Sequence, residues 1–362
     1  GNATSLVQAQ GAEASEAWPS MYLRMWDARK CKEPASDTFC RIVLVLPSQM
    51  EGCAETSPWE NVLKKHGDNT NGKIAKDIIW RLENPAGTIR QASNGLCGTA
   101  ANVFLLALAM PAKYAEMVAN IYCTGSHGEI DSSSTVFNSI REMVGRDPEK
   151  FIHTKSLAEG DIQAVDWMAM VSLRNSLMDH QYGIKSAAMR DYQGTSDAEE
   201  REYDRLIYNL KSSTEAFNIR GKTKFAGDLW GPVVAEASKN DIMYFLAVFI
   251  WNSKQEREKY MNDPRAHSNH IAVLVTTVTV NSTGPICILW TWAELRKSPC
   301  EMLGNFVVQA NRYDLKEVAA QQPPGTVDFG RVEHLKSEIA KISQSQITKI
   351  GDLYEDVGDE FN

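Results

Sequence analysis

The sequence contains no apolar run long enough to cross a membrane and lacks the basic excess of a nucleic-acid binder. A membrane-spanning helix needs about 18 consecutive apolar residues, and no stretch of the 362 residues approaches that length. The net charge is −8 at pH 7, whereas nucleic-acid-binding domains usually present a basic face. We therefore expect no membrane span and no nucleic-acid partner.

Targeting signals and repeats are also missing. Residues 1–16 are polar and rich in alanine, without the basic start and apolar centre of a signal peptide, and residues 1–20 are expected to form a flexible arm. No internal repeat or low-complexity tract interrupts the chain. The sequence leaves the localisation open. Secretion or translocation from a bacterium, without a visible signal peptide, is one of the alternatives.

Cysteines are few and irregularly spaced. The seven are Cys31, Cys40, Cys53, Cys97, Cys123, Cys287 and Cys300. They form no Cys-x-x-Cys pair and no Cys/His cluster with zinc-ligand spacing, so we expect no metal and no cofactor. An odd number leaves at least one thiol outside any set of disulfides. The scattered spacing fits a reducing compartment slightly better than a disulfide framework.

The first two thirds of the chain predict a mainly helical region. Residues 41–47 are apolar and largely β-branched, which predicts a buried strand. Residues 73–82 have apolar side chains on one side of a helix. Helical spacing returns in segments between residues 132 and 210. We interpret residues 129–215, approximately, as a helical insertion with solvated helix faces.

The last third changes to a strand pattern. Residues 242–251, 270–280 and 286–292 are rich in branched and aromatic side chains and predict three adjacent antiparallel strands. Residues 332–350 have the spacing of an amphipathic helix. The expected organisation is an arm (1–20), one α+β domain (21–325) and a C-terminal segment (326–362) with that helix and an acidic tail.

A stretch from Gln91 to Met110 stands at the centre of this organisation. A turn of small residues leads to Cys97, and the run from Ala100 to Met110 is apolar nearly all round, which predicts a buried helix. Unpaired N–H groups and the positive end of the helix dipole favour a thiolate at a helix start. The simpler interpretation is an inert cysteine in a core helix.

A nucleophilic cysteine needs a base, and histidine is the usual one. His270 stands out among the seven histidines because it opens the most strand-like segment of the chain. His267 is the nearby alternative, and His127, in a glycine-containing turn, is weaker. The others fit surface or helix-capping positions: His66, His153, His180 and His334.

Together these features resemble the papain-like cysteine proteases, and Cys97-Gly-Thr-Ala-Ala101 resembles their staphopain-like bacterial branch. The family has a glutamine six residues before its cysteine, as Gln91 precedes Cys97, and a later histidine that heads a strand, as His270 does. The resemblance implies that Gln91 and the Cys97 N–H form an oxyanion hole. The cysteine–histidine gap, roughly 170 residues, exceeds the family's about 130–150 and requires an insertion.

One departure concerns the residue that orients the histidine. Comparison with the family's Asn-Ser-Trp-Gly segment sets Trp292 on the tryptophan that shields the site and Trp290 on the asparagine. Trp290 cannot accept a hydrogen bond from imidazole. Glu294 and Thr291 are the local alternatives, although strand alternation disfavours Thr291 if Trp290 faces the histidine. Asn281 lies in a turn and is expected to be too distant.

The resemblance implies a fold in which the cysteine-headed helix packs on an antiparallel sheet, with an enlarged helical lobe. It implies a thiol hydrolase that cleaves a peptide or amide bond, with a peptide or protein as its substrate. Three alternatives remain, and the first two are a Cys–His deamidase or transglutaminase-type effector and a catalytically degenerate papain-like domain used for binding. A third is an α/β protein in which the apolar segments are only core.

Overall fold

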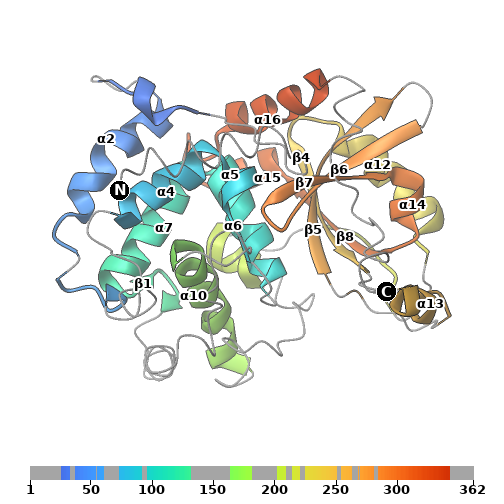
Figure 1. Cartoon of the computed structure of the whole chain (residues 1–362), viewed down its shortest axis with the longest axis horizontal. Helices are drawn as coiled ribbons and strands as arrows, with labels where there is room; N and C mark the ends of the chain where they lie inside the picture. The colour runs from blue at the N-terminus through green and yellow to red at the C-terminus, as the bar shows by residue number, and fades with distance from the viewer. Residues whose placement is uncertain are drawn as a thin grey trace.

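A computed structural model describes 13 stretches of the chain. They are residues 26–32, 37–53, 55–60, 73–91, 96–131, 164–181, 202–208, 214–220, 225–250, 254–262, 268, 270–280 and 284–342. Most of the helices gather on one side of the molecule and a twisted sheet occupies the other, with α6 (Cys97–Ala109) between them (Figure 1). The fold is therefore mixed α and β, as expected. The predicted arm, the predicted acidic tail and most of the middle region lie outside the described residues.

The large sheet has six strands in the order β3-β8-β4-β5-β6-β7, and every neighbouring pair is antiparallel. Its strands are β3 (Thr214–Asn218), β4 (Ile242–Val248), β5 (His270–Val280), β6 (Gly284–Thr291), β7 (Glu294–Pro299) and β8 (Val307–Asp314). The predicted trio β4-β5-β6 is confirmed. β7 was not predicted, because its sequence ELRKSP has the charge and proline of a loop. A separate two-stranded ribbon joins β1 (Ser126–His127) and β2 (Ile130–Asp131).

The helices pack around α6 and on both faces of the sheet. The larger ones are α2 (Thr38–Met50), α4 (Lys73–Glu83), α7 (Pro111–Thr124), α10 (Ala164–Gln181), α12 (Trp230–Ala237), α13 (Lys254–Asn262) and α16 (Phe329–Lys341). Short ones are α5 (Pro85–Thr88), α14 (Cys300–Gly304) and α15 (Leu315–Ala320). Single turns of other helix types occur at Ala28–Lys30, Asp204–Tyr208 and Gly227–Leu229. No helix in these stretches is long and apolar enough to span a membrane.

α6 is the predicted central helix, and all thirteen of its residues are buried. It packs on β5 and β6 and also contacts α7, α10 and α16. The helix begins at Cys97, and Met110 is its C-cap. Pro111 then starts α7, where its fixed φ and missing N–H are tolerated in the first turn. The sequence thus predicted both ends of the helix.

The strand predicted over residues 41–47 was wrong, because this segment belongs to helix α2. Asp37 caps the helix by accepting a hydrogen bond from the Cys40 N–H at 2.9 Å. The buried side chains Phe39, Leu46 and Met50 are seven and four residues apart and share one face. Pro47 lies near the C-terminal end, where one lost helical hydrogen bond costs least. Branched residues were the misleading signal.

The interpretation of the middle region as solvated helices was also wrong for α10. From Val165 to Arg174 every residue of the helix is buried, including Asp166 and Ser172. Trp167 packs edge-on against Trp59, with ring centroids 5.4 Å apart. α10 also contacts α4, α6 and α7. It is therefore part of the core that supports the central helix.

Six of the seven cysteines form disulfides, which corrects the preference for a reducing compartment. The pairs are Cys31–Cys40, Cys53–Cys123 and Cys287–Cys300. Scattered spacing misled the sequence interpretation, because disulfide partners are set by the fold rather than by sequence distance. Disulfides persist in oxidising environments, so the three pairs favour such a compartment.

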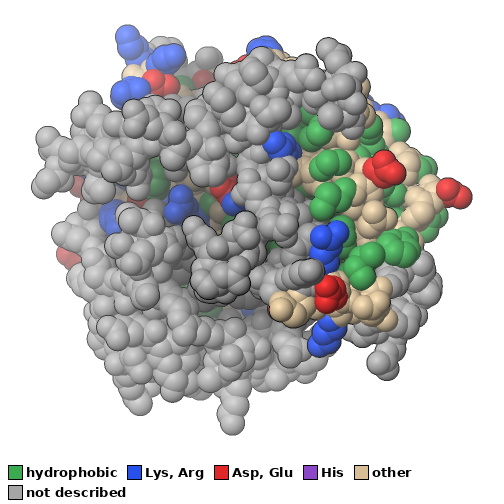
Figure 2. All heavy atoms as spheres, turned by 45° about the vertical axis from the view of Figure 1, so that its right-hand side comes forward, with side chains coloured by type: hydrophobic (Ala, Val, Ile, Leu, Met, Phe, Trp, Pro, Cys, Tyr) green, Lys and Arg blue, Asp and Glu red, His purple; other side chains and the backbone are tan. Residues whose placement is uncertain are grey.

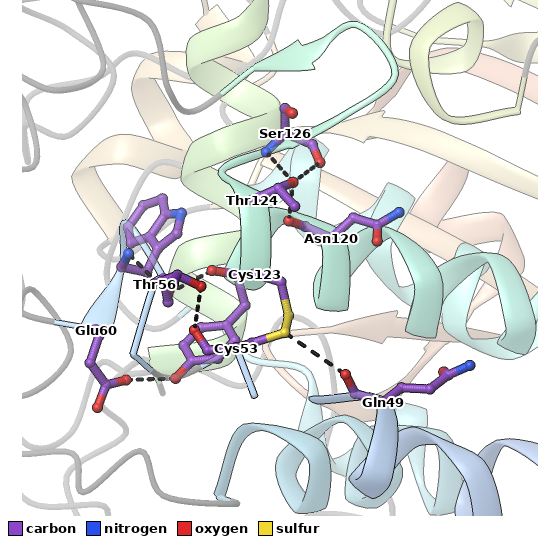
Figure 3. The surroundings of a disulfide bond; sticks show 11 residues. Gln49, Cys53, Thr56, Glu60, Asn120, Cys123, Thr124 and Ser126 are labelled. Atoms are coloured by element: carbon purple, nitrogen blue, oxygen red, sulfur yellow. Dashed lines mark hydrogen bonds between the residues drawn. A yellow bond between two sulfur atoms is a disulfide. The ribbon is translucent and has the colours of Figure 1, made fainter. Parts of the chain in front are cut away.

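The Cys53–Cys123 disulfide joins the turn after α2 to the end of α7 (Figure 3). Beside it, the Tyr122 hydroxyl donates to the Glu60 carboxylate at 2.5 Å. The Thr124 hydroxyl donates to the Asn120 carbonyl at 2.9 Å and closes the last turn of α7. This cross-link spans 70 residues, whereas Cys31–Cys40 spans only 9.

The long-range disulfide is predicted to stabilise the fold more than the short one. In the chain-entropy model the advantage grows with loop length and is about 2 kcal/mol between these two loops. Cys53→Ser/Cys123→Ser should therefore lower the free energy of unfolding about 2 kcal/mol further than Cys31→Ser/Cys40→Ser. Denaturant unfolding of both double variants measures the difference. Equal losses would contradict the prediction.

Candidate functional site

Cys97 is the cysteine that forms no disulfide, and all seven cysteines lie within the described stretches. It is the first residue of α6 and is 5% exposed. The first N–H groups of a helix have no acceptors within it, and the helix dipole adds a partial positive charge there. Both effects stabilise a thiolate relative to the thiol. The chain thus keeps its thiol where a helix favours the anion.

His270 is the first residue of β5, and its imidazole is enclosed by the next hairpin. Its Nε2 lies 2.5 Å from the Thr291 hydroxyl oxygen. The Trp292 ring stacks on the imidazole with centroids 4.5 Å apart and an interplanar angle of 29°. The residue is 7% exposed, and this burial lowers the pKa of His270 to about 3. The imidazole is therefore neutral near pH 7, so one of its ring nitrogens has no proton.

The Thr291 hydroxyl can determine which nitrogen of the His270 imidazole accepts a proton. A hydroxyl both donates and accepts hydrogen bonds, whereas a neutral imidazole has one N–H and one acceptor nitrogen. If Nε2 carries the proton and donates to Thr291, Nδ1 is left as the basic nitrogen. A side-chain amide oxygen would do the same for a histidine. Thr291 thus offers the acceptor that Trp290 cannot provide.

A strained turn presents Trp292 to the imidazole. Trp292 and Ala293 have φ angles of 48° and 66°, and they are the two central residues of the β6–β7 hairpin, between paired Thr291 and Glu294. Two positive φ angles define a type I′ turn, which normally contains Asn and Gly. Holding two other residues there costs about 1–3 kcal/mol each. The turn sets Trp292, which is 39% exposed, over His270.

Trp290 points away from the histidine, so the condition under which strand alternation disfavoured Thr291 is not met. Trp290 stacks on Phe104 of α6, with ring centroids 4.3 Å apart and planes at 4°. Its indole N–H donates to the Ala86 carbonyl at 2.9 Å. Successive side chains of a strand alternate between faces. Because Trp290 faces α6, Thr291 occupies the other face, where it meets His270.

The remaining sequence candidates lie elsewhere or outside the described residues. Glu294 forms an ion pair with Arg296 on β7. The His127 ring lies 3.1 Å from the Asn120 side chain at the end of α7. Asn281 and His267 fall outside the described stretches. The sequence therefore named Thr291 as an alternative, and the orientation of Trp290 decides that it meets His270.

Cys97 and His270 begin elements that run in the same direction. Phe104 stacks on Trp290, which is paired with Val273 of β5. Cys97 precedes Phe104 by seven helical residues, and His270 precedes Val273 by three strand residues; both separations correspond to about 10 Å. Both residues therefore lie at one end of the contact between α6 and β5.

The other ends of α6 and β5 also lie together, which fixes this direction. Arg331 of α16 donates to the Leu108 carbonyl in the last turn of α6 at 3.0 Å. Five residues on, Lys336 donates to the Ile242 carbonyl at 2.5 Å. Ile242 begins β4, two residues before the Tyr244–Leu274 pair, and so lies beside the second half of β5.

Gln91 is buried, with 6% of its surface exposed, in the segment that joins α5 to α6. The preceding peptide N–H, of Arg90, donates to the Asp166 carboxylate at 3.2 Å. Ile89 is extended, with φ −79° and ψ 116°. This backbone bond lies within the segment that leads toward Cys97.

A groove among the described residues lies away from these side chains. It has a volume of about 1070 Å³ and is formed by α2, α7 and residues 322–326. Lys113 spans one side of it and donates to the Gln322 side chain at 3.1 Å. Neither Cys97 nor His270 lines it. In the described ranges, no three His, Cys, Asp or Glu side chains gather closely enough to hold a metal ion.

Large hydrophobic side chains are exposed at several described positions. They are Val45, Phe225, Leu229, Trp292 and Phe329. On the sheet side of the molecule, Figure 2 shows hydrophobic side chains with acidic and basic ones between them. Such a mixed surface is ordinary for a protein.

Comparison of the chain with protein-family models, with curated protein sequences and with solved structures found no match in any of the three. A functional assignment has to be argued from the chemistry and placement of the site residues themselves. The candidate site consists of Gln91, Cys97, His270, Thr291 and Trp292.

The buried neutral imidazole predicts a specific dependence of stability on pH. The pKa of His270 is about 3 in the folded chain and about 6.5 in an unfolded one. Between these values the unfolded state binds a proton that the folded state does not, so stability falls as pH drops below about 6.5. Above that pH His270 is neutral in both states and no longer makes the free energy of unfolding depend on pH.

Replacing His270 by glutamine should remove this part of the acid sensitivity. Between pH 7 and pH 4.5 the variant is expected to lose about 2.5 kcal/mol less free energy of unfolding than the wild type. Urea unfolding at the two pH values measures both losses. Parallel losses would show that the imidazole is not held neutral.

Proposed function

We propose that this protein is a thiol acyl-transfer enzyme in which Cys97 attacks a peptide or amide carbonyl. The observation that carries the proposal is the selective retention of one thiol: six cysteines form disulfides, and the seventh begins a buried helix. An odd thiol at a helix N-terminus is suited to nucleophilic chemistry.

A papain-like arrangement is part of the proposal. It is supported by a buried helix that begins at Cys97 and packs on an antiparallel sheet, and by a histidine at the start of the strand beneath it. The stacked Trp292 and the Thr291 contact give His270 an orienting shell. In this arrangement Thr291 takes the place of the family's asparagine.

The acylation step is a proton transfer followed by addition to the carbonyl. His270 Nδ1 takes the proton of the Cys97 thiol, and the sulfur forms a bond to the carbonyl carbon while the carbonyl π electrons move to oxygen. Gln91 and the Cys97 N–H stabilise this oxyanion. Its collapse breaks the C–N bond, and the amine leaves with the proton from the imidazolium.

The thioester is then resolved by a second nucleophile. Water gives up a proton to His270, attacks the carbonyl carbon and releases a carboxylic acid and the Cys97 thiol. An amine as acceptor would give transglutamination, and a glutamine side chain as the donor would give deamidation. All three reactions use the same residues, and hydrolysis of a peptide or amide is the simplest.

The reactivity of Cys97 tests whether His270 acts as its base. Iodoacetamide should alkylate Cys97 at pH 7, and His270→Ala should slow the reaction by roughly tenfold to a hundredfold, because a positioned base contributes about this much or more. With the disulfides intact, mass spectrometry assigns the label to one thiol. His127→Ala is the matched control and should leave the rate unchanged. Equal rates in the wild type and His270→Ala would exclude the pair.

The role of Thr291 is tested with two substitutions that separate the effect of its hydroxyl from that of its methyl group. Thr291→Val removes the hydroxyl and keeps the shape, whereas Thr291→Ser keeps the hydroxyl. The p-nitrophenolate burst from p-nitrophenyl acetate reports acylation of Cys97. The valine variant should acylate about tenfold more slowly, equivalent to about 1.4 kcal/mol, and the serine variant should stay close to wild type. A serine variant as slow as the valine variant would contradict this role.

A catalytically silent binding domain is the second candidate, and one observation favours it. Alternation along β5 sets His270 on the opposite face from Val273, whose partner Trp290 stacks on α6. An imidazole turned from the helix would not deprotonate Cys97. Under this alternative the p-nitrophenolate burst is absent or survives Cys97→Ser, whereas under the enzyme proposal Cys97→Ser abolishes it.

A further inference from the structure

A buried ion pair lies beneath the segment that carries Gln91. Arg81 of α4 and Asp166 of α10 are both fully buried. The guanidinium donates twice to the carboxylate, from Nε to Oδ1 at 3.0 Å and from Nη2 to Oδ2 at 2.9 Å. This two-point geometry fixes the orientation of the carboxylate as well as its position.

The ion pair is better suited to positioning than to stability. Removing two charges from water costs several kcal/mol per ion, and replacement of buried pairs by apolar residues is often neutral or stabilising. Asp166 Oδ2, however, also accepts the Arg90 peptide N–H at 3.2 Å. The carboxylate therefore connects two core helices to the backbone residue that directly precedes Gln91.

We propose that Asp166, oriented by Arg81, is a positioning residue that holds Gln91 in place to stabilise the oxyanion. The inference rests on the proposed function of Cys97. Consecutive Cα atoms are about 3.8 Å apart, so fixing the Arg90 N–H leaves the Gln91 backbone little freedom. A donor displaced by about 1 Å can lose about a hundredfold in rate. The buried face of α10 gives this helix a role at the site.

The test compares two reactions of the same thiol. Acylation by p-nitrophenyl acetate passes through a tetrahedral oxyanion, whereas alkylation by iodoacetamide displaces iodide and forms none. A defect in oxyanion stabilisation slows the first reaction and leaves the second unchanged. A general disturbance of Cys97 slows both.

Two sets of variants remove the anchor in different ways. Arg81→Met/Asp166→Leu replaces the ion pair by apolar side chains of similar size, and the denaturant midpoint checks its folding. Arg90→Pro removes the arginine side chain together with the N–H that donates to Asp166, and Ile89 is already extended as proline requires of its predecessor. Arg90→Ala keeps that N–H and is the matched control. The proline variant tests the inference even where the ion-pair variant does not fold.

The expected result is a roughly tenfold to hundredfold loss of acylation rate in the ion-pair and proline variants, with unchanged alkylation. Arg90→Ala should acylate like the wild type. In a Gln91→Ala background the ion-pair replacement should cause no further loss of acylation rate, because both changes remove the same contribution of Gln91 to oxyanion stabilisation. Equal losses in both reactions, or losses that multiply with Gln91→Ala, would overturn the positioning role.

Failure of the underlying function would appear differently. If the burst persists in Cys97→Ser, or is absent from the wild type, Cys97 is not the acylated group and the inference falls with the proposed function. If the burst requires Cys97 but neither anchor variant changes it, the acyl-transfer proposal stands and only the role of Asp166 is overturned.

Discussion

Arg331 provides the interaction on which the central helix depends. A helix buried along its whole length leaves its last carbonyl groups without water, so the protein must supply donors. The buried Arg331 guanidinium donates to the Leu108 carbonyl of α6 and to the Leu82 carbonyl of α4, at 3.0 and 2.5 Å. It also lies 4.1 Å from the centre of the Trp26 ring. One guanidinium thereby donates hydrogen bonds to carbonyl groups at the C-terminal ends of two helices.

The charge of Arg331 suits this position. Burial lowers its pKa to about 10, so the guanidinium is still protonated near pH 7, and a cation at a helix C-terminus interacts favourably with the dipole. The Asp328 N–H donates to the Ala109 carbonyl at 2.7 Å and completes the closure. The far end of α6 is thus satisfied by α16 and its cap. The end at Cys97 is the one that the proposed function uses.

The sequence predicted the elements whose signals are local. An uninterrupted apolar run predicts the buried helix α6, and a long series of β-branched residues predicts the strand β5. Neither pattern is typical of a solvent-exposed segment. It failed where a tertiary contact decides. α2 has a strand-like composition, but the Asp37 cap and one buried face make it a helix. Disulfide partners 70 residues apart cannot be read from spacing.

The same limit applies to the candidate site. Cys97, His270 and Trp292 could be named from the sequence because each begins an element or follows a recognisable one. The contact between His270 and Thr291 could not, since it depends on which face of β6 meets α6. That choice is made by the Trp290–Phe104 stack and by the Trp290 hydrogen bond to Ala86, both long-range contacts. An error of one residue in strand orientation exchanges the two faces.

The anchors of the site come from segments far apart in the chain. α10 supplies Asp166 beneath the Gln91 segment, α5 supplies the carbonyl that holds Trp290, and α16 closes α6. Each of these hydrogen bonds joins polar groups that are buried in the helical half or where it meets the sheet. A buried polar group left without a hydrogen-bond partner there would cost about 1–3 kcal/mol of stability. Burial therefore makes these positions mutually dependent. The helical region therefore supports the geometry around Cys97 through these contacts.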